Sequence, residues 1–378
     1  MFRFFYLGIG WLLYLAALPL LLILSLLPKY RQSIPARFFL WRNPPFEEEG
    51  IWLHACSLGE VNALKPIIAR LDTPVNLTVT TQTGYAAAGR LPVTRRYLPF
   101  EIFLPWWVRK QKALVVMEAE LWYMLFASAK RRGIPTCLIN ARISDRSYGR
   151  YMRFGWYFRR VFAHVDKLFA QSEKDRVRLI ALGARDVEVT GNIKSIATAE
   201  VTRALPKPQR ELLILASTHT GEERMLLEAL RGSGRTIVVV PRHPERFEAV
   251  ARDVAKFCEE SGCSFHRFSQ SADLESDVVL MDRMGELVNL YAIADVVILG
   301  GSFVPDVGGH NPLEPAQFGV KLLSGRYIFN QEALFPLIEN AVLCAPDALE
   351  REIAAARPAR ILARANIDRL LEVFRDVV

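Results

Sequence analysis

Cysteine is scarce in this 378-residue sequence, and the few cysteines exclude two kinds of structure. Five cysteines are scattered along the chain, and no two of them form a C-x-x-C pair. An odd, scattered set argues against a disulfide framework and a cysteine-based zinc site, and it fits a reducing compartment. The six histidines have no metal-ligand spacing, and no Asp-x-Asp pair flanked by apolar residues is present. We therefore expect no metal site and no bound cofactor.

Length and composition indicate a folded chain of two domains. A chain of 378 residues is too long for one ordinary domain, so two domains of about 150–200 residues are expected. Hydrophobic residues make up 51% of the chain and charged residues 23%, which argues against disorder.

The charge is distributed unevenly. Residues 29–195 hold 27 Lys and Arg against 14 Asp and Glu, a net charge of +13, whereas residues 196–378 hold 20 against 26, a net charge of −6. A basic first half beside an apolar segment suggests anionic lipid headgroups or an anionic lipid substrate. A nucleic-acid surface is the alternative, but no nucleic-acid-binding motif appears, so we expect no nucleic-acid partner.

The N-terminal segment is apolar and uncharged from Phe4 to Leu27. That length is enough to cross a bilayer as a helix, and Pro19 could kink it. A cleaved signal peptide fits poorly, because the apolar run is too long and no A-x-A site follows it. Basic residues follow the run, so the positive-inside rule places the rest of the chain in the cytoplasm. We therefore predict a membrane anchor over residues 1–30; a helix lying in the membrane interface or buried against the protein is the alternative.

From residue 51 onward, short β-rich runs alternate with amphipathic helices, which predicts parallel sheets covered on both faces. In the first half we predict strands at Ile51–Cys56, Leu77–Thr80, Ala113–Met117, Thr136–Asn140, Lys167–Ala170 and Val187–Thr190. A helix is predicted at Val61–Leu71, and further helical stretches lie between most of the strands. The later strands are Glu211–Ala216, Thr236–Val240, Val278–Met281 and Asp295–Leu299.

The polar, proline-containing residues 196–210 interrupt this alternation and are predicted to be a linker. The predicted domains are therefore residues 31–195 and residues 211–378, each Rossmann-like, facing each other across a cleft. A final helix is expected over about residues 358–378, and it could pack on either domain. Because ligands bind at the carboxyl ends of parallel strands, we expect the functional residues just after the strands.

Polar motifs follow the strands of the first half. Gly59 is expected to permit a tight turn after Ser57, and Glu60 is a candidate general base, although it could simply cap its helix. Glu118 and Glu120 are two more carboxylates, of which one could face a ligand while the other caps a helix. Arg142 could hold a carboxylate or phosphate, or form a salt bridge within its loop. Asn192 and Lys194, in the run GNIK, end this half.

The second half repeats the pattern. Thr218 and His219, in the run STHTGEE, suggest an anion site at a helix start, and Arg242 and His243 follow the next strand with groups that suit a phosphate or a sugar carboxylate. Met284, Gly285 and Glu286 precede a helix and could present backbone groups to a base. The glycine-rich run GGHNPLEPA contains Gly309, Asn311 and Glu314, and Glu314 could bind the two ribose hydroxyls, although glycine-rich loops are usually just turns.

Taken together, these motifs resemble the 3-deoxy-D-manno-octulosonic acid (Kdo) transferase family of lipopolysaccharide synthesis. The residues that carry the resemblance are SLGE (57–60), MEAELW (117–122), NARISDRS (140–147), GNIK (191–194), STHTGEE (217–223), PRHPER (241–246), MGEL (284–287) and GGHNPLEPA (308–316), with Asn330 also in place. Ala119, Tyr123 and the run Gly325-Arg326-Tyr327 depart from the family's usual residues.

The resemblance implies a GT-B fold at the bacterial inner membrane and an inverting, metal-independent transfer of Kdo from CMP-Kdo to a lipid A precursor. It implies that Glu60 is the general base and that Glu118 and Glu120 lie near the donor sugar or the acceptor. It places Arg242, His243, Asn311 and Glu314 in the donor site. We expect the donor site also to include Asn192, Lys194, Thr218, His219, Met284, Gly285, Glu286, Gly309 and Asn330. A nucleotide-sugar epimerase of the same architecture and a non-catalytic, membrane-tethered binding protein are the alternative hypotheses.

Overall fold

The computed structural model describes residues 1–196, 199–362 and 365–377, with side chains as far as Glu372. The chain forms two compact units, which are described separately here. Unit 1 comprises Met1–Ala197 and Arg364–Val378, and unit 2 comprises Thr198–Ala363. The C-terminal segment therefore belongs to unit 1, whereas residues 211–378 were predicted as one domain whose last helix could pack on either side. Residues 197–198 of the predicted linker lie outside the described residues.

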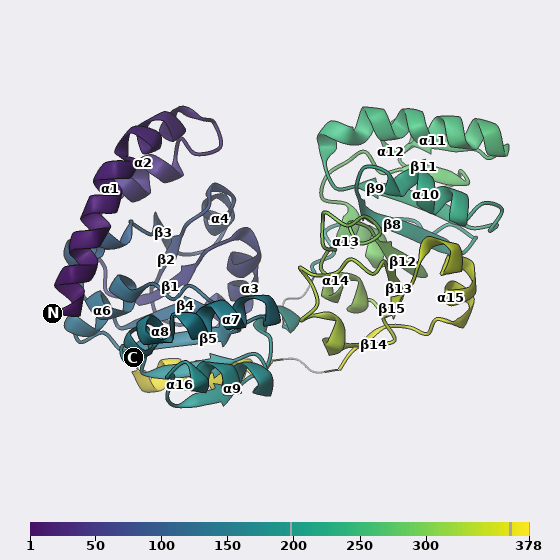
Figure 1. The fold of residues 1–378 in the computed structure, drawn as a ribbon. Helices are drawn as coiled ribbons and strands as arrows, with labels where there is room; N and C mark the ends of the chain where they lie inside the picture. The colour runs from purple at the N-terminus through teal and green to yellow at the C-terminus, as the bar shows by residue number, and fades with distance from the viewer. Residues whose placement is uncertain (197–198, 363–364, 378) are drawn as a thin grey trace. The chain divides into compact units, whose positions relative to one another are not determined.

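An apolar helix, α1 (Phe2–Leu26), opens unit 1, and a short helix, α2 (Ser33–Phe38), lies beside it (Figure 1). At 1.5 Å per residue α1 is about 37 Å long, so by length and composition it could cross a membrane. One stripe of the helix, which includes Tyr6, Tyr14 and Leu21, is partly or fully covered by unit 1. The remaining face is apolar and exposed, and it is compatible with membrane association.

The sheet of unit 1 has seven strands in the order β3-β2-β1-β4-β5-β6-β7, and every neighbouring pair is parallel. The strands are β1 (Ile51–Ala55), β2 (Val75–Val79), β3 (Thr94–Tyr97), β4 (Ala113–Met117), β5 (Thr136–Ala141), β6 (Lys167–Ala170) and β7 (Val187–Val189). Because all strands run the same way, all their carboxyl ends lie at one edge of the sheet.

Helices cover both faces of this sheet. They are α3 (Leu58–Ile68), α4 (Gln82–Ala88), η1 (Glu101–Phe103), α5 (Leu104–Trp107), α6 (Tyr123–Arg131), α7 (Asp145–Arg153), α8 (Gly155–Phe162), α9 (Glu173–Ala181), η2 (Ile193–Ser195) and α16 (Ile367–Val377). Successive residues of β1 enter different cores, as the alternation of a strand requires. Leu53 packs in the core that contains residues of α3, α4 and α16, whereas Trp52 packs in the core that contains residues of α5, α6 and α8.

Unit 2 repeats the architecture. Its seven strands follow the order β10-β11-β9-β8-β12-β13-β15, again with parallel neighbours. They are β8 (Leu212–Thr218), β9 (Thr236–Pro241), β10 (Phe265–Arg267), β11 (Val278–Leu280), β12 (Val296–Leu299), β13 (Lys321–Ser324) and β15 (Val342–Leu343), with a separate antiparallel pair, β14 (Ile338–Glu339) and β16 (Arg360–Ile361).

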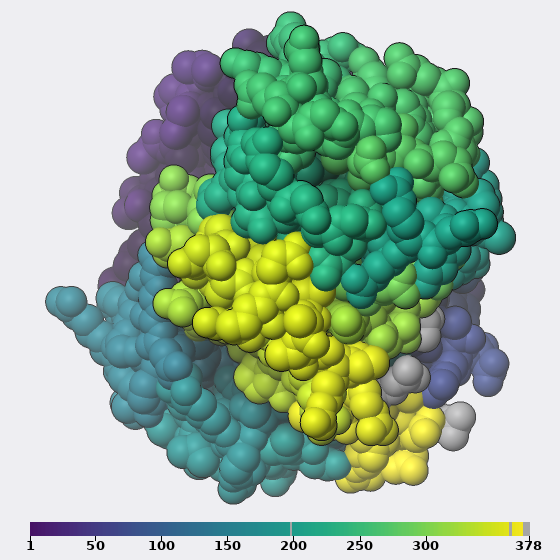
Figure 2. All heavy atoms as spheres, turned by 90° about the vertical axis from the view of Figure 1, so that its right-hand side faces the viewer, coloured from purple at the N-terminus to yellow at the C-terminus, as the bar shows by residue number. Residues whose placement is uncertain are grey.

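The helices of unit 2 are α10 (Glu222–Ala229), η3 (Pro244–Arg246), α11 (Phe247–Ser261), α12 (Phe268–Ser271), α13 (Leu287–Tyr291), α14 (Leu313–Ala316), η4 (Phe335–Leu337), η5 (Pro346–Ala348) and α15 (Leu349–Ala355). Leu226 and Leu227 of α10 share a core with Leu349 and Ile353 of α15. In the space-filling view of this unit the yellow segment that contains α15 packs against the teal segment that contains α10 (Figure 2).

The prediction of two Rossmann-like α/β units with an N-terminal apolar helix is confirmed. Two details are wrong. The predicted helix over residues 358–378 begins only at Ile367, because Arg360 and Ile361 pair with β14 as a strand. The sequence analysis also missed the short strands β3, β10, β13 and β15, which lie toward or at the edges of the two sheets.

We expect Leu370→Ala to destabilise unit 1, because Leu370 of α16 is fully buried in the core beneath α3 and α4. Truncating a buried leucine costs about 2–5 kcal/mol of unfolding free energy. Urea unfolding of the detergent-solubilised chain, followed by circular dichroism, measures the change. Leu362→Ala is the matched control, since Leu362 is 62% exposed and its truncation should change the free energy by no more than about 0.5 kcal/mol. Equal effects of the two variants would contradict the assignment of α16 to the core of unit 1.

Candidate functional site

Three carboxylates of unit 1, Glu60, Glu118 and Glu120, form what we call the acid cluster. Glu60 lies in the first turn of α3, which follows β1, and the other two lie in the loop after the neighbouring strand β4. The negative charges of Glu118 and Glu120 both raise the pKa of Glu60, so the three groups interact electrostatically. The structure thus brings together three residues that the sequence analysis placed at two separate strand ends.

Glu60 is held by two hydrogen bonds. The backbone N–H of Cys56 donates to Oε2 at 2.7 Å, and the hydroxyl of Ser57 donates to Oε1 at 3.0 Å. The residue is only 8% exposed. Burial raises its pKa most, the charge of Glu118 raises it further, and the two hydrogen bonds lower it in part. A fixed carboxylate with a raised pKa is suited to accept a proton near neutral pH.

Gly59 does not form the predicted tight turn. It is the second residue of α3, its φ angle is not positive, and an added Cβ would meet only the Oγ of Ser57, at 3.9 Å. Ser57 is the N-cap residue, but its hydroxyl donates to Glu60 rather than capping a backbone N–H. A side chain at position 59 would therefore meet open space rather than a clash.

Glu118 has an unusual backbone conformation. Its φ angle is +56°, in the left-handed region that non-glycine residues seldom adopt. Its carboxylate forms an ion pair with Lys194 Nζ at 2.6 Å and accepts a long hydrogen bond from Asn140 Nδ2 at 3.4 Å. Lys194, predicted to bind the donor, is thus paired with the acid cluster of unit 1.

Glu120 accepts a hydrogen bond from Trp122 Nε1 at 2.6 Å and lies 3.7 Å from Nε2 of His54. Burial raises its pKa, but the nearby ring of His54 and the hydrogen bond from Trp122 outweigh that effect, and the net pKa is lowered. Neither Glu118 nor Glu120 caps the following helix, so that alternative is wrong. Both side chains are 21% exposed and point toward groups of the site.

Two residues near the acid cluster escaped the sequence analysis. His54 is fully buried on β1, its Nδ1 contacts the carbonyl of Thr78 at 3.1 Å, and its Nε2 faces Glu120. Arg37 of α2 donates from Nε to the carbonyl of Leu98. Burial lowers the pKa of Arg37, and the nearby charge of Glu120 partly offsets this effect. A histidine in an apolar strand and an arginine far upstream give no sequence signal of their position.

Arg142 and Asn192 behave differently from each other. Arg142 is half-buried after β5 and has no hydrogen bond or ion pair with any described residue, so a salt bridge within its loop is not formed. Asn192 is buried, accepts from the N–H of Lys194 at 3.0 Å, and donates to Gln171 at 3.0 Å. Asn192 therefore shapes the loop that carries Lys194.

In unit 2 a carboxylate of the chain itself fills the predicted anion site. Glu222, at the start of α10, is fully buried and accepts hydrogen bonds from four backbone N–H groups. The donors are His219, Gly301, Ser302 and Phe303, at 2.6–3.1 Å. Glu222 thus fixes the glycine-containing loop after β12 to the loop after β8.

Thr218 is not available to a ligand, contrary to the prediction. It is fully buried and donates to Oε1 of Glu223 at 2.7 Å. Glu223 in turn pairs with Arg246 at 2.8 Å. The hydroxyl of Thr218 therefore has a structural partner.

Three histidines of unit 2, His219, His243 and His310, form what we call the histidine cluster. The rings of His219 and His310 stack with centroids 5.2 Å apart, and their Nε2 atoms are 3.0 Å apart. Burial lowers the pKa of His219, and burial together with Arg242 lowers that of His310 to about 4. Both rings are therefore neutral at pH 7, so one Nε2–H can donate to the other.

Arg242 supplies a positive charge beside this cluster. Its side chain is exposed and has no hydrogen bond or ion pair among the described residues, yet its charge lowers the pKa of His310 and of Glu314. His243 lies 5.4 Å from His219, ring to ring, and 3.8 Å from Glu245. A free guanidinium of this kind can bind a phosphate or a carboxylate.

The loop after β12 brings further predicted residues to the same edge. Asn311 donates to Oε1 of Glu314 at 3.2 Å and accepts from the N–H of Leu313. Burial raises the pKa of Glu314, which Asn311 and Arg242 partly offset. Gly309 has a φ of +81°, and the amide of Asn330 donates to the carbonyl of Val307 at 2.7 Å. Gly309 and Asn330 therefore shape the loop.

The run from Met284 to Glu286 precedes α13. Met284 is 61% exposed and Gly285 has a φ of +89°, as expected of a loop that presents its backbone. Glu286 is engaged by Arg203 at 2.9 Å and by Asn289 at 2.9 Å. Its carboxylate therefore holds the loop against the start of unit 2.

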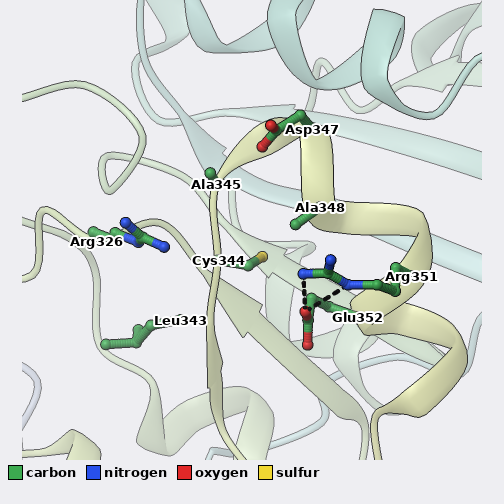
Figure 3. Close-up of a pocket in the computed structure, with 8 residues that line it drawn as sticks. All are labelled: Arg326, Leu343, Cys344, Ala345, Asp347, Ala348, Arg351 and Glu352. Atoms are coloured by element: carbon green, nitrogen blue, oxygen red, sulfur yellow. Dashed lines mark hydrogen bonds and ion pairs between the residues drawn. The ribbon is translucent and has the colours of Figure 1, made fainter.

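A cavity of about 330 Å³ in unit 2 contains none of the predicted site residues (Figure 3). It is lined by Arg326, Leu343, Cys344, Ala345, Asp347, Ala348, Arg351 and Glu352. Two of its charged residues, Arg351 and Glu352, are paired with each other at 2.7 Å. The acid cluster is therefore the candidate site of unit 1, and the histidine cluster, rather than this cavity, is the candidate site of unit 2.

We expect Arg242→Gln to raise the pKa of His310, because it removes a nearby positive charge that disfavours the imidazolium. The pKa should stay below 6.5, since burial is the larger cause of the shift. NMR titration of the histidine ring protons measures this pKa. Arg252→Gln, at an exposed position of α11, is the control. An unchanged pKa in Arg242→Gln would show that the guanidinium does not lie beside the ring.

Comparison with known proteins supports the resemblance. A sequence model of the 3-deoxy-D-manno-octulosonic acid transferase family matches residues 32–197. The chain is 34% identical to a 3-deoxy-D-manno-octulosonic acid transferase of Haemophilus influenzae, over 94% of this chain and 90% of the relative. It is 33% identical to the Bordetella pertussis enzyme of that name, over 79% and 76% of the two chains.

Solved structures show the fold. A UDP-N-acetylglucosamine 2-epimerase is similar with a TM-score of 0.55 at 14% identity, over 83% of this chain and 92% of that one. The enzyme from Neisseria meningitidis gives 0.53 at 11% identity, over 86% and 93%. At these identities the likeness extends to the fold alone, whereas the closer sequence relatives are transferases. The chain therefore belongs to the 3-deoxy-D-manno-octulosonic acid (Kdo) transferase family, and it is a glycosyltransferase.

Proposed function

We propose that this chain transfers Kdo from CMP-Kdo to a lipid A precursor, with Glu60 as the general base. Family membership supports Kdo transfer in lipopolysaccharide synthesis. The observation that carries the assignment of the base is the environment of Glu60: it is buried, held by two hydrogen bonds and flanked by Glu118, with a raised pKa.

In the proposed reaction, unit 2 binds the donor. Arg242 binds its phosphate or sugar carboxylate, Glu314 the ribose hydroxyls, and the backbone around Gly285 the base. This proposal is supported by the free guanidinium of Arg242 and by the loops that Glu222 and Asn311 hold in place. Because the stacked rings of His219 and His310 are neutral at pH 7, the guanidinium of Arg242 supplies the positive charge beside them.

Glu60 then accepts the proton of an acceptor hydroxyl. At the same time the oxygen of that hydroxyl forms a bond to the anomeric carbon of Kdo. The bond from that carbon to the phosphate oxygen breaks, and CMP leaves with the bonding electrons. Direct displacement inverts the anomeric centre. Positive groups near the phosphate stabilise the charge that develops on it.

The reaction is proposed to need no metal. Among the described residues no group of three or more His, Cys, Asp or Glu side chains could hold a metal ion. Charge stabilisation is assigned to Arg242, whose exposed guanidinium has no partner among the described residues.

The proposed location is the cytoplasmic face of the bacterial inner membrane, with α1 as the single anchor. The apolar face of α1 and the net charge of +13 on residues 29–195 support binding to an anionic bilayer and to a phosphorylated lipid. No nucleic acid is proposed as a partner.

Replacing Glu60 tests the base. Glu60→Gln keeps an oxygen that can accept the N–H of Cys56 but removes the basic group, and Glu60→Ala removes both. We expect both variants to lose ~10²-fold or more of the transfer rate and to bind CMP-Kdo normally by isothermal titration calorimetry. Transfer by Glu60→Gln at a rate near that of the wild type would refute the assignment.

The pH profile of transfer tests the effect of Glu118 on the pKa of Glu60. Because the charge of Glu118 raises the pKa of Glu60, Glu118→Gln should lower that pKa and move the acidic limb of kcat/KM to lower pH. The change also leaves Lys194 without its partner Glu118, and the positive charge of Lys194 then lowers the pKa of Glu60 as well. Glu120→Gln, whose charge contributes less, is the matched control with a smaller shift. An acidic limb that stays in place or moves to higher pH in Glu118→Gln would mean that another group titrates.

A further inference from the structure

Glu101 is a buried carboxylate outside the acid cluster. It connects the N-terminal helix to the start of α6, the helix that follows the loop carrying Glu118 and Glu120. Glu101 lies in η1 and is 7% exposed. The hydroxyl of Tyr6, on α1, donates to Oε1 at 2.5 Å. The backbone N–H of Met124, in the first turn of α6, donates to Oε2 at 2.6 Å. One carboxylate therefore connects α1 to α6.

The start of α6 depends on this contact. The N-cap residue of α6, Trp122, makes no side-chain hydrogen bond to the helix, so Glu101 satisfies one of the N–H groups that a helix start leaves free. The ring of Phe2 also packs edge-on against Tyr123, at 5.0 Å. The first turns of α1 and α6 thus lie side by side (Figure 1).

A second tyrosine holds the same segment. Tyr157, on α8, donates its hydroxyl to the carbonyl of Leu121 at 3.2 Å and accepts from the N–H of Tyr123 at 3.3 Å. Its ring stacks on that of Tyr6, with centroids 6.1 Å apart. Residues 121–124 are therefore fixed by groups from η1 and α8, both of which contact Tyr6 of α1.

The fixed segment directly follows the strained part of the loop. Glu118 has left-handed backbone, and Glu120 lies one residue before Leu121. Strained backbone persists only where the surrounding structure determines it. Loosening residues 121–124 would therefore let Glu118 and Glu120 leave their places beside Lys194 and His54.

We infer that Tyr6, acting through Glu101, is a positioning residue that holds the loop carrying Glu118 and Glu120. The N-terminal helix is thus part of the catalytic architecture and not only an anchor. Membrane binding and loop positioning use different sides of α1, because Phe4, Phe5 and Leu12 on the apolar face are 76%, 65% and 69% exposed. The catalytic part of this inference rests on the proposed function, whereas its structural part does not.

The test compares Tyr6→Phe with Tyr14→Phe in the full-length chain in lipid nanodiscs. Each change removes one hydroxyl from α1, but the hydroxyl of Tyr14 donates to the carbonyl of Phe38 in α2 and not to Glu101, the carboxylate that holds Met124. Hydrogen exchange of the peptide spanning residues 118–126, read by mass spectrometry, reports on the loop. Transfer kinetics report on its catalytic consequence.

We expect Tyr6→Phe to raise exchange in this peptide by about tenfold and to lower kcat by about tenfold, with the KM for the donor and nanodisc binding unchanged. Tyr14→Phe should change neither measurement. Glu101→Gln should retain most activity, since its amide can still accept from Met124 and bond to Tyr6, whereas Glu101→Ala should resemble Tyr6→Phe or be worse.

Unchanged exchange in Tyr6→Phe would overturn the inference, and so would raised exchange with an unchanged kcat. An equal loss in Tyr14→Phe would also overturn it, because the effect would then belong to the helix as a whole. If the wild-type chain transfers no Kdo, the proposed function fails, but the exchange of the loop still decides whether Tyr6 positions it.

Discussion

The structure depends on the carboxyl ends of its parallel strands, where the backbone must turn sharply while carrying polar side chains. Glu118, Asn140 and Ser217 have φ angles of +56°, +54° and +56°, and each lies at or directly after the end of β4, β5 or β8. Such conformations are costly for non-glycine residues. They are found here because hydrogen bonds from neighbouring loops fix the backbone on both sides of each turn.

Buried carboxylates provide much of that fixation. Glu222 gathers four N–H groups from two loops of unit 2, and Glu101 joins α1 to α6 in unit 1. Both residues fix the backbone without contacting a substrate. Each replaces the hydrogen bonds that water would otherwise make to backbone groups. Glu222 thereby fixes the loops beside the histidine cluster, and Glu101 fixes the start of α6, which follows the loop of Glu118 and Glu120.

The sequence predicted the long buried elements well, because their apolar runs are continuous. The strands Ala113–Met117 and Lys167–Ala170 were placed to the residue. Strands such as β3, with the residues TRRY, or β10, with FHR, have no apolar run, since they lie at sheet edges and are partly exposed. Pairing with a neighbouring strand creates them, and that pairing is not encoded in local sequence.

The places of the candidate residues at strand ends could be predicted, but their contacts could not. Glu60, Glu118 and Arg242 follow β1, β4 and β9, as the sequence analysis expected. Hydrogen-bond geometry decides the rest: it buries the hydroxyl of Thr218 against Glu223, fills the anion site with Glu222 and pairs Lys194 with Glu118. His54 was missed because a single histidine in the run IWLHAC gives no sign that its ring faces Glu120.

The account as a whole is tested most directly by supplying the purified chain with CMP-Kdo and a lipid A precursor, in the presence of a chelator, and weighing the lipid product by mass spectrometry. The account requires a lipid heavier by Kdo and an equal amount of released CMP. An unmodified lipid, CMP released without lipid modification, or a modification that the chelator abolishes would contradict it.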